Sequence, residues 1–206
     1  AMQVDLSWDV ESGNDPVDHE YVQLAEEIGL MHELGAWRLE KACLQAEAWQ
    51  RSNAPRTVAV PLTATELQRG DLYETVRVAL RRAGLSPALL WLSIPEALLM
   101  HDIEQSKRTL NALAALGVGL AVSAFGAGRS HLPSLAQMPI AALQIDQALL
   151  RAATQGEVAE SALRGLIALG HAIGIGTIAG QCDSDAQLEA ARKTVERADG
   201  HARRGP

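Results

Sequence analysis

The sequence predicts an α/β protein in which parallel strands are joined by helices. Short apolar runs alternate with segments of helical periodicity about six times along the 206 residues. Hydrophobic residues make up 48% of the chain but aromatic residues only 3%, and an aliphatic core of this kind favours an α/β protein over an all-β sandwich. Strands joined by helices favour parallel pairing with right-handed crossovers. Both an open doubly wound sheet and a closed barrel satisfy this pattern.

Six apolar runs are predicted to be strands. They cover residues 3–8, 57–62, 89–94, 118–122, 141–145 and 173–178. Pro61 and Pro95 lie at the ends of the second and third runs. Because proline has no N–H to donate to a strand ladder, we expect these strands to stop there.

Six segments with helical spacing separate and follow these strands. They cover residues 17–28, 31–50, 72–83, 102–116, 158–169 and 184–195. Gly29, Gly84 and Gly117 each directly follow one of these segments, as expected of residues that end helices. The long helix over residues 31–50 is predicted to bury an apolar face made of Leu34, Trp37, Leu39, Cys43, Leu44 and Ala48.

Composition excludes several classes of function. The formal net charge is −7 and no basic stripe is interleaved with aromatic residues, which disfavours a nucleic-acid partner. No apolar stretch approaches the ~20 residues that a membrane span requires, and no signal peptide opens the sequence. We therefore expect a cytoplasmic protein, or the cytosolic module of a larger membrane-attached one. Cys43 and Cys182 form no CxxC pair, so both are expected to be reduced thiols.

The segment from Ser123 to Leu132 has the glycine-rich pattern of an active-site loop but contains no acidic residue. It follows the predicted strand over residues 118–122, and barrel enzymes keep catalytic side chains at the carboxyl ends of their strands. Here those positions hold Ser123 and Ala124, whose hydroxyl and methyl groups cannot replace carboxylates around a divalent cation.

Four segments resemble the EAL-domain phosphodiesterases, which hydrolyse the bacterial second messenger cyclic di-GMP. Tyr21–Leu30 resembles the helix after the signature strand, and VAVPLT at Val58–Thr63 resembles the family's VAVNLS. FGAGRSHL at Phe125–Leu132 resembles FGTGYSSL, and LQID at Leu143–Asp146 resembles LKID. The resemblance spans residues 3–206. It implies a modified TIM (β/α)8-type barrel that lacks the family's usual first strand, and a single degenerate EAL-like domain over residues 1–206 of a larger signalling protein.

The resemblance also implies that the family's active-site residues are replaced in this chain. The signature glutamate falls on Gln3, the metal-binding asparagine on Pro61 and the next metal-binding glutamate on Ser93. The two adjacent aspartates fall on Ser123 and Ala124. Two-metal hydrolysis needs several anionic oxygen ligands, and none of these side chains supplies one.

The replacements continue towards the C-terminus. The family's water-activating lysine falls on Gln144 and a further glutamate on Gly180, whereas Asp183 keeps a carboxylate. Asp199 stands where the family has a glutamine. Since one carboxylate cannot recruit a pair of cations, the resemblance predicts a degenerate phosphodiesterase that has no metal, no other cofactor and no enzyme activity.

Nucleotide binding is a separate question from hydrolysis. Arg129 is the one cation expected near the mouth of the barrel, and with Gly126, Gly128 and Asp183 it forms the candidate ligand-binding set. A solvated arginine in a structural loop is the favoured interpretation of Arg129. Binding of cyclic di-GMP is therefore disfavoured.

Three further residues carry specific expectations. Glu96 matches the glutamate that anchors the family's Phe125–Leu132 loop. Asp146 is expected to cap the following helix rather than to face the barrel mouth. Trp91 replaces an outward-facing acid, and both partial burial and a partner surface remain open for it.

Together these features predict a catalytically inactive EAL-like regulatory module of bacterial signalling. It would act through protein–protein contacts, with a protein partner or as a homodimer. The alternative is a receptor that binds cyclic di-GMP without hydrolysing it.

Overall fold

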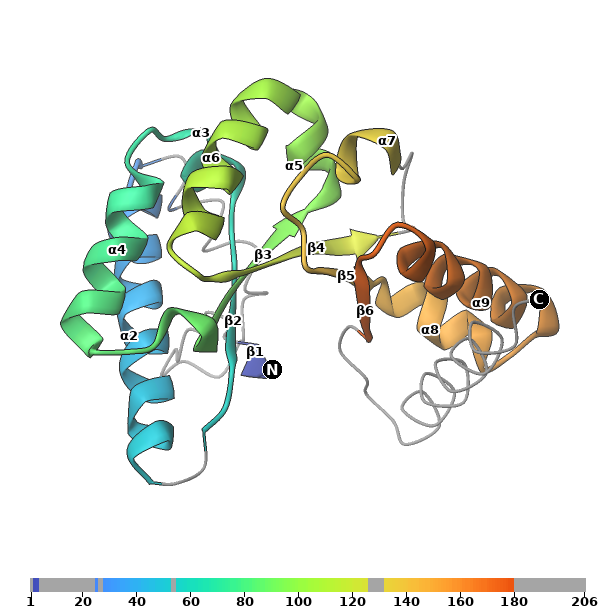
Figure 1. Cartoon of the computed structure of the whole chain (residues 1–206), viewed down its shortest axis with the longest axis horizontal. Coiled ribbons are helices and arrows are strands. Elements are labelled where there is room, and N and C mark those ends of the chain that lie inside the picture. The colour runs from blue at the N-terminus through green and yellow to red at the C-terminus, as the bar shows by residue number, and fades with distance from the viewer. Residues whose placement is uncertain (1, 4–24, 26–27, 53–54, 126–131, 180–206) are drawn as a thin grey trace. The chain divides into compact units, whose positions relative to one another are not determined.

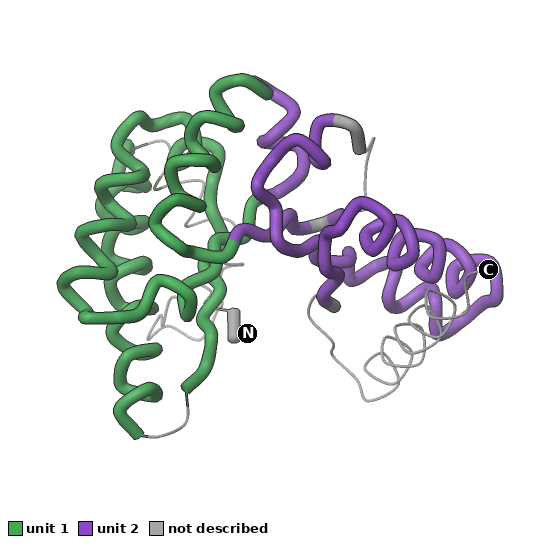
Figure 2. The backbone as a smooth tube through the Cα atoms, viewed as in Figure 1, with its two compact units in different colours: residues 1–94, 102–119 green, residues 95–101, 120–206 purple. Residues whose placement is uncertain are grey.

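The computed structural model describes residues 2–3, 25, 28–52, 55–125 and 132–179 of the chain (Figure 1). It divides into two compact units (Figure 2). The first takes in residues 1–94 and 102–119, and the second residues 95–101 and 120–206. Each unit is built from parallel strands and helices, which confirms the predicted α/β class.

The strands of the first unit are β1 (Met2–Gln3), β2 (Val58–Pro61) and β3 (Leu90–Pro95). They pair in parallel, with Met2 opposite Val58, and Val58 in turn opposite Leu90. The helices of this unit are α2 (Met31–Arg51), α3 (Ala64–Gln68), α4 (Leu72–Ala83), the 3-10 turn η1 (Pro87–Leu89) and α6 (Ile103–Ala115). Of these, α3 and η1 lie outside the predicted elements.

Helix α2 buries part of the predicted face: Leu39 and Cys43 are buried as expected, whereas Trp37, Leu44 and Ala48 are exposed. Its buried residues recur at helical spacing and are Met31, Gly35, Arg38, Leu39, Ala42, Cys43 and Ala46. Trp37 and Leu44, expected in the core, are 53% and 43% exposed. The buried face includes a glycine and two alanines, and small residues of this kind let α2 pack closely against α4 and β2. The close packing of its small residues therefore determines which face α2 buries, and the larger side chains of Trp37 and Leu44 stay exposed.

The two central strands of the first unit supply its aliphatic core. Val58, Val60, Leu90, Leu92 and Ile94 are all fully buried. As buried parallel strands require, the ladder is continuous from Val58 opposite Leu90 to Pro61 opposite Ser93.

Trp91 lies half-buried in β3, with its indole ring over Gly119. A Cβ atom at Gly119 would sit 2.4 Å from that ring, so the glycine makes the close approach possible. Of the two interpretations left open for Trp91, the structure supports partial burial.

The strands of the second unit are β4 (Gly119–Phe125), whose first residue belongs to the first unit, β5 (Ala142–Ile145) and β6 (Gly176–Ala179). Ala142 is paired in parallel both with Ala121 of β4 and with Gly176 of β6. The helices are α5 (Glu96–His101), α7 (Leu132–Leu135), α8 (Gln147–Ala153) and α9 (Glu157–Ala172). A buried cluster joins β5 to α8 and α9 and consists of Ile145, Leu150, Ala153, Leu163 and Ile167. In the part of the chain that the structure describes, no helix is both long and apolar enough to cross a membrane.

Candidate functional site at the strand ends

The carboxyl ends of β2 and β3 form a candidate site in the first unit. Pro61 lies opposite Ser93 in the ladder, and the next backbone amide, that of Leu62, donates to the Ser93 carbonyl at 2.8 Å. Pro61 has no N–H, so the last bond of this ladder comes from Leu62. Ser93 is buried. Pro61 and Ser93, two of the positions predicted to replace metal ligands, therefore lie side by side on adjacent strands. They bring a pyrrolidine ring and a hydroxyl group to this edge of the sheet.

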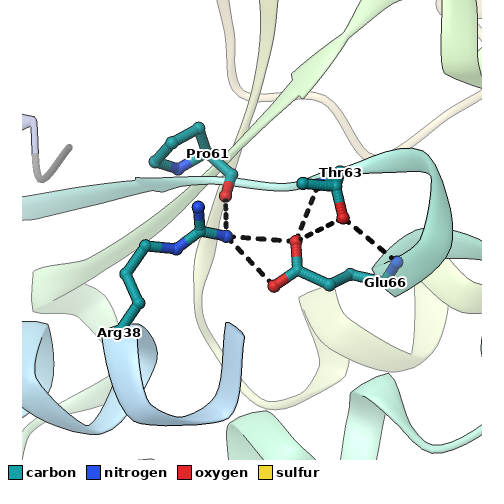
Figure 3. A network of polar contacts seen from close by, with 4 residues as sticks. All are labelled: Arg38, Pro61, Thr63 and Glu66. Atoms are coloured by element: carbon teal, nitrogen blue, oxygen red, sulfur yellow. Dashed lines mark hydrogen bonds and ion pairs between the residues drawn. The ribbon is translucent and has the colours of Figure 1, made fainter. Parts of the chain in front are cut away.

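Behind this strand end lies a buried ion pair that joins three elements (Figure 3). Arg38 of α2 is 5% exposed and Glu66 of α3 is 9% exposed. The Arg38 Nη2 donates to the Pro61 carbonyl at 2.6 Å and to both carboxylate oxygens of Glu66 at 3.0 Å. The guanidinium thus holds a backbone oxygen at the end of β2 and a side chain at the start of α3.

Glu66 in turn closes a capping box with Thr63. The Thr63 side chain accepts from the Glu66 amide at 3.3 Å, and Glu66 Oε2 accepts from the Thr63 amide at 2.7 Å and from its hydroxyl at 2.9 Å. A threonine followed three residues later by a glutamate is the usual sequence signature of such a box. The pattern therefore starts α3 directly after β2.

Gly35 leaves the room that the Glu66 carboxylate occupies. A Cβ atom at residue 35 would sit 2.0 Å from Glu66 Oε1. Since the carboxylate is held by Arg38 and Thr63, it could not move away without breaking those bonds. The buried glycine on α2 is thus part of the same arrangement.

In the second unit the strand ends carry Ser123 and Gln144, both half-buried. Gln144 lies opposite Ile178 in the β5–β6 ladder. The β4–β5 register shifts between Val122 and Phe125, which is the stretch that contains Ser123 and Ala124. Irregularities of this kind re-aim side chains at the ends of strands and often occur beside active sites.

Two predicted positioning residues lie in the same unit. Asp146 caps α8, with its Oδ1 accepting from the Ala148 amide at 2.8 Å, and this confirms the capping expectation. Glu96 is a buried residue that begins α5. Its anchoring of the Phe125–Leu132 loop stays a prediction, because residues 126–131 lie outside the described part.

The remaining predicted site residues are not among the described ones. They are Gly126, Gly128, Arg129, Gly180, Asp183 and Asp199. Of the N-terminal signature, Gln3 lies in β1, paired with Ala59 of β2. The ligand-binding set built around Arg129 and Asp183 therefore stays a prediction.

The described strand ends do not fit a pair of divalent cations. Within the described ranges, no group of three or more His, Cys, Asp or Glu side chains could hold a metal ion. Pro61, Ser93, Ser123 and Gln144 bring no carboxylate to the strand ends, and of the two acids that directly follow β3 and β5, Glu96 begins α5 and Asp146 caps α8. Divalent cations of the hard class prefer several carboxylate oxygens.

A hollow of about 310 Å³ is lined by residues of α2 and α4 and by Asp71. Each of its acidic side chains pairs with an arginine: Glu40 with Arg82 at 3.7 Å, Asp71 with Arg69 at 3.1 Å and Glu74 with Arg77 at 2.6 Å. The hydrogen bond from Arg69 lowers the pKa of Asp71 below its usual value. The rim of this hollow is thus already neutralised by its own salt bridges.

The Arg38–Glu66 pair was missed by sequence reasoning. Two signals pointed to it: an arginine among the positions of α2 that turn inward, and the threonine–glutamate spacing of a capping box after β2. Neither signal predicts that the two side chains meet, because their contact spans 28 residues.

Comparison with known proteins identifies the family. Residues 1–195 match the sequence model described as EAL domain. The signaling protein YkoW of Bacillus subtilis is 31% identical over 170 residues, which cover 82% of this chain and 21% of YkoW. The bifunctional diguanylate cyclase/cyclic di-GMP phosphodiesterase MucR of Pseudomonas aeruginosa is 32% identical over 82% of this chain and 25% of its own. The chain thus spans about a quarter or less of these relatives.

Solved structures agree with this match. The MucR phosphodiesterase, solved as a c-di-GMP complex, superposes with a TM-score of 0.86 at 29% identity and covers 93% of this chain and 78% of that one. The FimX EAL domain gives a TM-score of 0.84 over 93% of this chain and 77% of that one. At 23% identity, the FimX likeness supports the fold alone.

The prediction that the chain is not an enzyme is contradicted by these relatives. NbdA of Pseudomonas aeruginosa, 36% identical over 63% of this chain and 17% of its own, is named a cyclic di-GMP phosphodiesterase. PA2567 of the same organism carries the same name at 31% identity over 78% of this chain and 27% of its own. The prediction rested on individual replacements, and Gly180, Asp183 and Asp199 lie outside the described residues.

The predicted resemblance and the predicted modified TIM-barrel class are both confirmed by these matches. The sequence model covers nearly the whole chain, and YkoW and MucR exceed 30% identity over more than four-fifths of it. This chain belongs to the EAL domain family.

Proposed function

We propose that the chain is the EAL module of a cyclic di-GMP signalling protein and that it binds cyclic di-GMP at the carboxyl ends of its strands. The observation that carries this proposal is its similarity to the MucR domain, which was solved as a c-di-GMP complex. Barrel folds of this type keep their ligands at that end of the strands. The proposal reverses the order given by the sequence, which placed a protein contact first.

The described side chains suit a polar, phosphate-bearing ligand. Ser93 in the first unit carries a hydroxyl group, and in the second unit Ser123 carries a hydroxyl and Gln144 an amide group; groups of these kinds hydrogen-bond phosphate oxygens or base edges. With a net charge of −7 the chain as a whole does not attract an anion, so local donors must hold the phosphates. Arg129 and the backbone of the Gly126–Gly128 turn are the sequence's candidates for that task.

Titration calorimetry with cyclic di-GMP, with and without Mg²⁺ or Ca²⁺, tests the proposal. We expect a dissociation constant in the micromolar range, which corresponds to about −8 kcal/mol. Gln144→Ala should weaken binding, whereas Gln155→Ala, an exposed glutamine after α8, should leave it unchanged. No heat at 100 times this concentration would overturn the proposal. Analysis of the same samples for the linear dinucleotide measures hydrolysis directly.

A protein contact is the second candidate, and one observation favours it. Trp37 and Leu44 are both exposed on α2, and their spacing of seven residues places them on one face of the helix. Lys41 lies 5.9 Å from the Trp37 ring centre on the same side. Apolar residues gathered on one face are typical of interaction surfaces.

We propose that a second copy of this chain covers that face. Sedimentation velocity over a range of concentrations should then show a dimer. The dimer should dissociate at a higher protein concentration in Trp37→Ser than in Gln50→Ser, an exposed control on another face of the same helix. A monomer at every concentration in the unsubstituted chain would exclude this second candidate.

A further inference from the structure

We infer that Arg38 and Glu66 are positioning residues for the strand-end site. They hold the Pro61–Thr63 turn, which places the corner of the site formed by β2 and β3. As far as the ligand is concerned, the inference rests on the proposed binding of cyclic di-GMP. Its geometric part concerns the turn alone and can be tested without ligand.

Three consecutive residues of the turn have a backbone group fixed by a specific partner, and Figure 3 shows two of the three, at Pro61 and Thr63. The carbonyl of Pro61 accepts from Arg38 at 2.6 Å, and the amide of Leu62 donates to the Ser93 carbonyl at 2.8 Å. The amide of Thr63 donates to Glu66 at 2.7 Å. Two of these three restraints come from the buried ion pair, so the pair determines where the turn lies.

The chemistry of the pair favours a positioning role over a purely stabilising one. Buried ion pairs add little stability compared with apolar residues of similar size, because both charges must be desolvated. All the contacts of Arg38 with Pro61 and Glu66 come from one nitrogen, Nη2, whose N–H groups point in fixed directions in the guanidinium plane and so fix orientation as well as distance. Such a pair is therefore better suited to defining a geometry than to stabilising the fold.

Two further features are consistent with this role. The buried Arg38 Nε has no hydrogen-bond partner among the described residues, so the side chain is aimed at Pro61 and Glu66 at the expense of one donor. Gly35 keeps open the space for the carboxylate, where a Cβ would sit 2.0 Å from Oε1. Helix α2 thus supplies both the arginine and the space for its carboxylate partner.

The decisive variant removes both charges at once, as Arg38→Met with Glu66→Leu. Because no buried charge is left alone, this chain should fold. We expect amide hydrogen exchange at Leu62 and Thr63 to become at least about tenfold faster. We also expect cyclic di-GMP to bind about tenfold more weakly, a loss of about 1.4 kcal/mol.

Two companion variants separate positioning from stability. Val76→Ala removes buried volume from α4 in the same unit, so it should lower the melting temperature without changing the dissociation constant. Arg38→Lys keeps the buried charge but replaces the rigid guanidinium plane that directs Nη2 with a freely rotating ammonium group, so it should give intermediate exchange and intermediate affinity.

Each outcome decides a defined part of the inference. Unchanged exchange at Leu62 and Thr63 in the double variant would overturn it, and so would unchanged affinity in a chain that binds the nucleotide. If the unsubstituted chain binds no cyclic di-GMP, the proposed function fails, while the exchange data still decide the positioning role.

Discussion

Two strand-to-helix junctions, one in each unit, perform the same local task in different ways. In the first unit β2 passes into α3 through Thr63, whose cap is tied to Glu66 and through it to the buried Arg38. In the second unit β5 passes into α8 through Asp146, which accepts one amide at 2.8 Å and is half-buried.

The difference shows what the additional charges contribute. A cap formed by one side chain is enough to start a helix, as Asp146 demonstrates. The junction in the first unit therefore contains more than helix initiation needs. What the buried pair adds is a bond to the Pro61 carbonyl, and so a link between the helix start and the strand end.

Breaking the charged junction should have the largest effect. Arg38→Met alone leaves the Glu66 carboxylate buried without its cation, so the free energy of unfolding should fall by about 3–5 kcal/mol. Urea denaturation followed by circular dichroism measures this loss. The double variant Arg38→Met with Glu66→Leu serves as the control and should recover most of it. A loss below about 1 kcal/mol in the single variant would mean that the pair is not effectively buried.

A pair of glycine substitutions sharpens the same contrast. Gly35→Ala should destabilise by about 1–3 kcal/mol, because the new methyl group displaces the Glu66 carboxylate. Gly165→Ala on α9 meets nothing within 4 Å and should stabilise by about 0.5–1 kcal/mol. Thermal unfolding of the two variants should give shifts of opposite sign, and equal shifts would contradict the crowding at residue 35.

Cys43 provides a test of burial on the same face of α2. Burial, with a smaller contribution from the charge of Glu40, raises the pKa of Cys43 from 9.0 to about 12. Below pH 9 both the folded and the unfolded thiol are protonated, so the stability is fully present. Above pH 9 only the unfolded thiol ionises, and stability falls by about 1.4 kcal/mol per pH unit until the folded value is reached.

Comparison with Cys43→Ala isolates this dependence, because every other group titrates in both chains. Unfolding free energies measured from pH 8 to pH 10 should fall more steeply in the unsubstituted chain. Parallel curves would show that Cys43 is accessible to solvent in the folded state.

The isolated cap should show the smallest effect. Asp146→Ala removes the one acceptor of the Ala148 amide and should cost about 1 kcal/mol of unfolding free energy. Asp146→Asn keeps an acceptor oxygen and should restore most of the loss. Chemical denaturation resolves a difference of this size, and a cost above about 2 kcal/mol would indicate a role beyond capping.

Elements with strong periodicity could be predicted from the sequence. The segment over residues 72–83 coincides with α4, and that over residues 31–50 ends one residue before α2 does. Residues 141–145 and 158–169 also fall on β5 and α9. The short helices α3, α5, α7 and α8 were missed, because four to seven residues give too little periodicity to detect.

The candidate site was less predictable than the fold. Pro61 was correctly expected at a strand end, because the missing N–H is a local property. The partner of its carbonyl was not, since Arg38 looks like one more polar residue until the helix orientation is known. Trp37 and Leu44 were wrongly placed in the core for the same reason, because the small residues on the opposite side decided which face was buried.

The absent side chain at residue 35 has a consequence for how this corner can change over time. An alanine there displaces the acid at residue 66, and the acid is the counter-ion of residue 38. A substitution at one of residues 35, 38 and 66 therefore favours compensating substitutions at the other two. Positions 35, 38 and 66 should therefore vary as a set among descendants of this sequence, although 31 residues separate the first from the last.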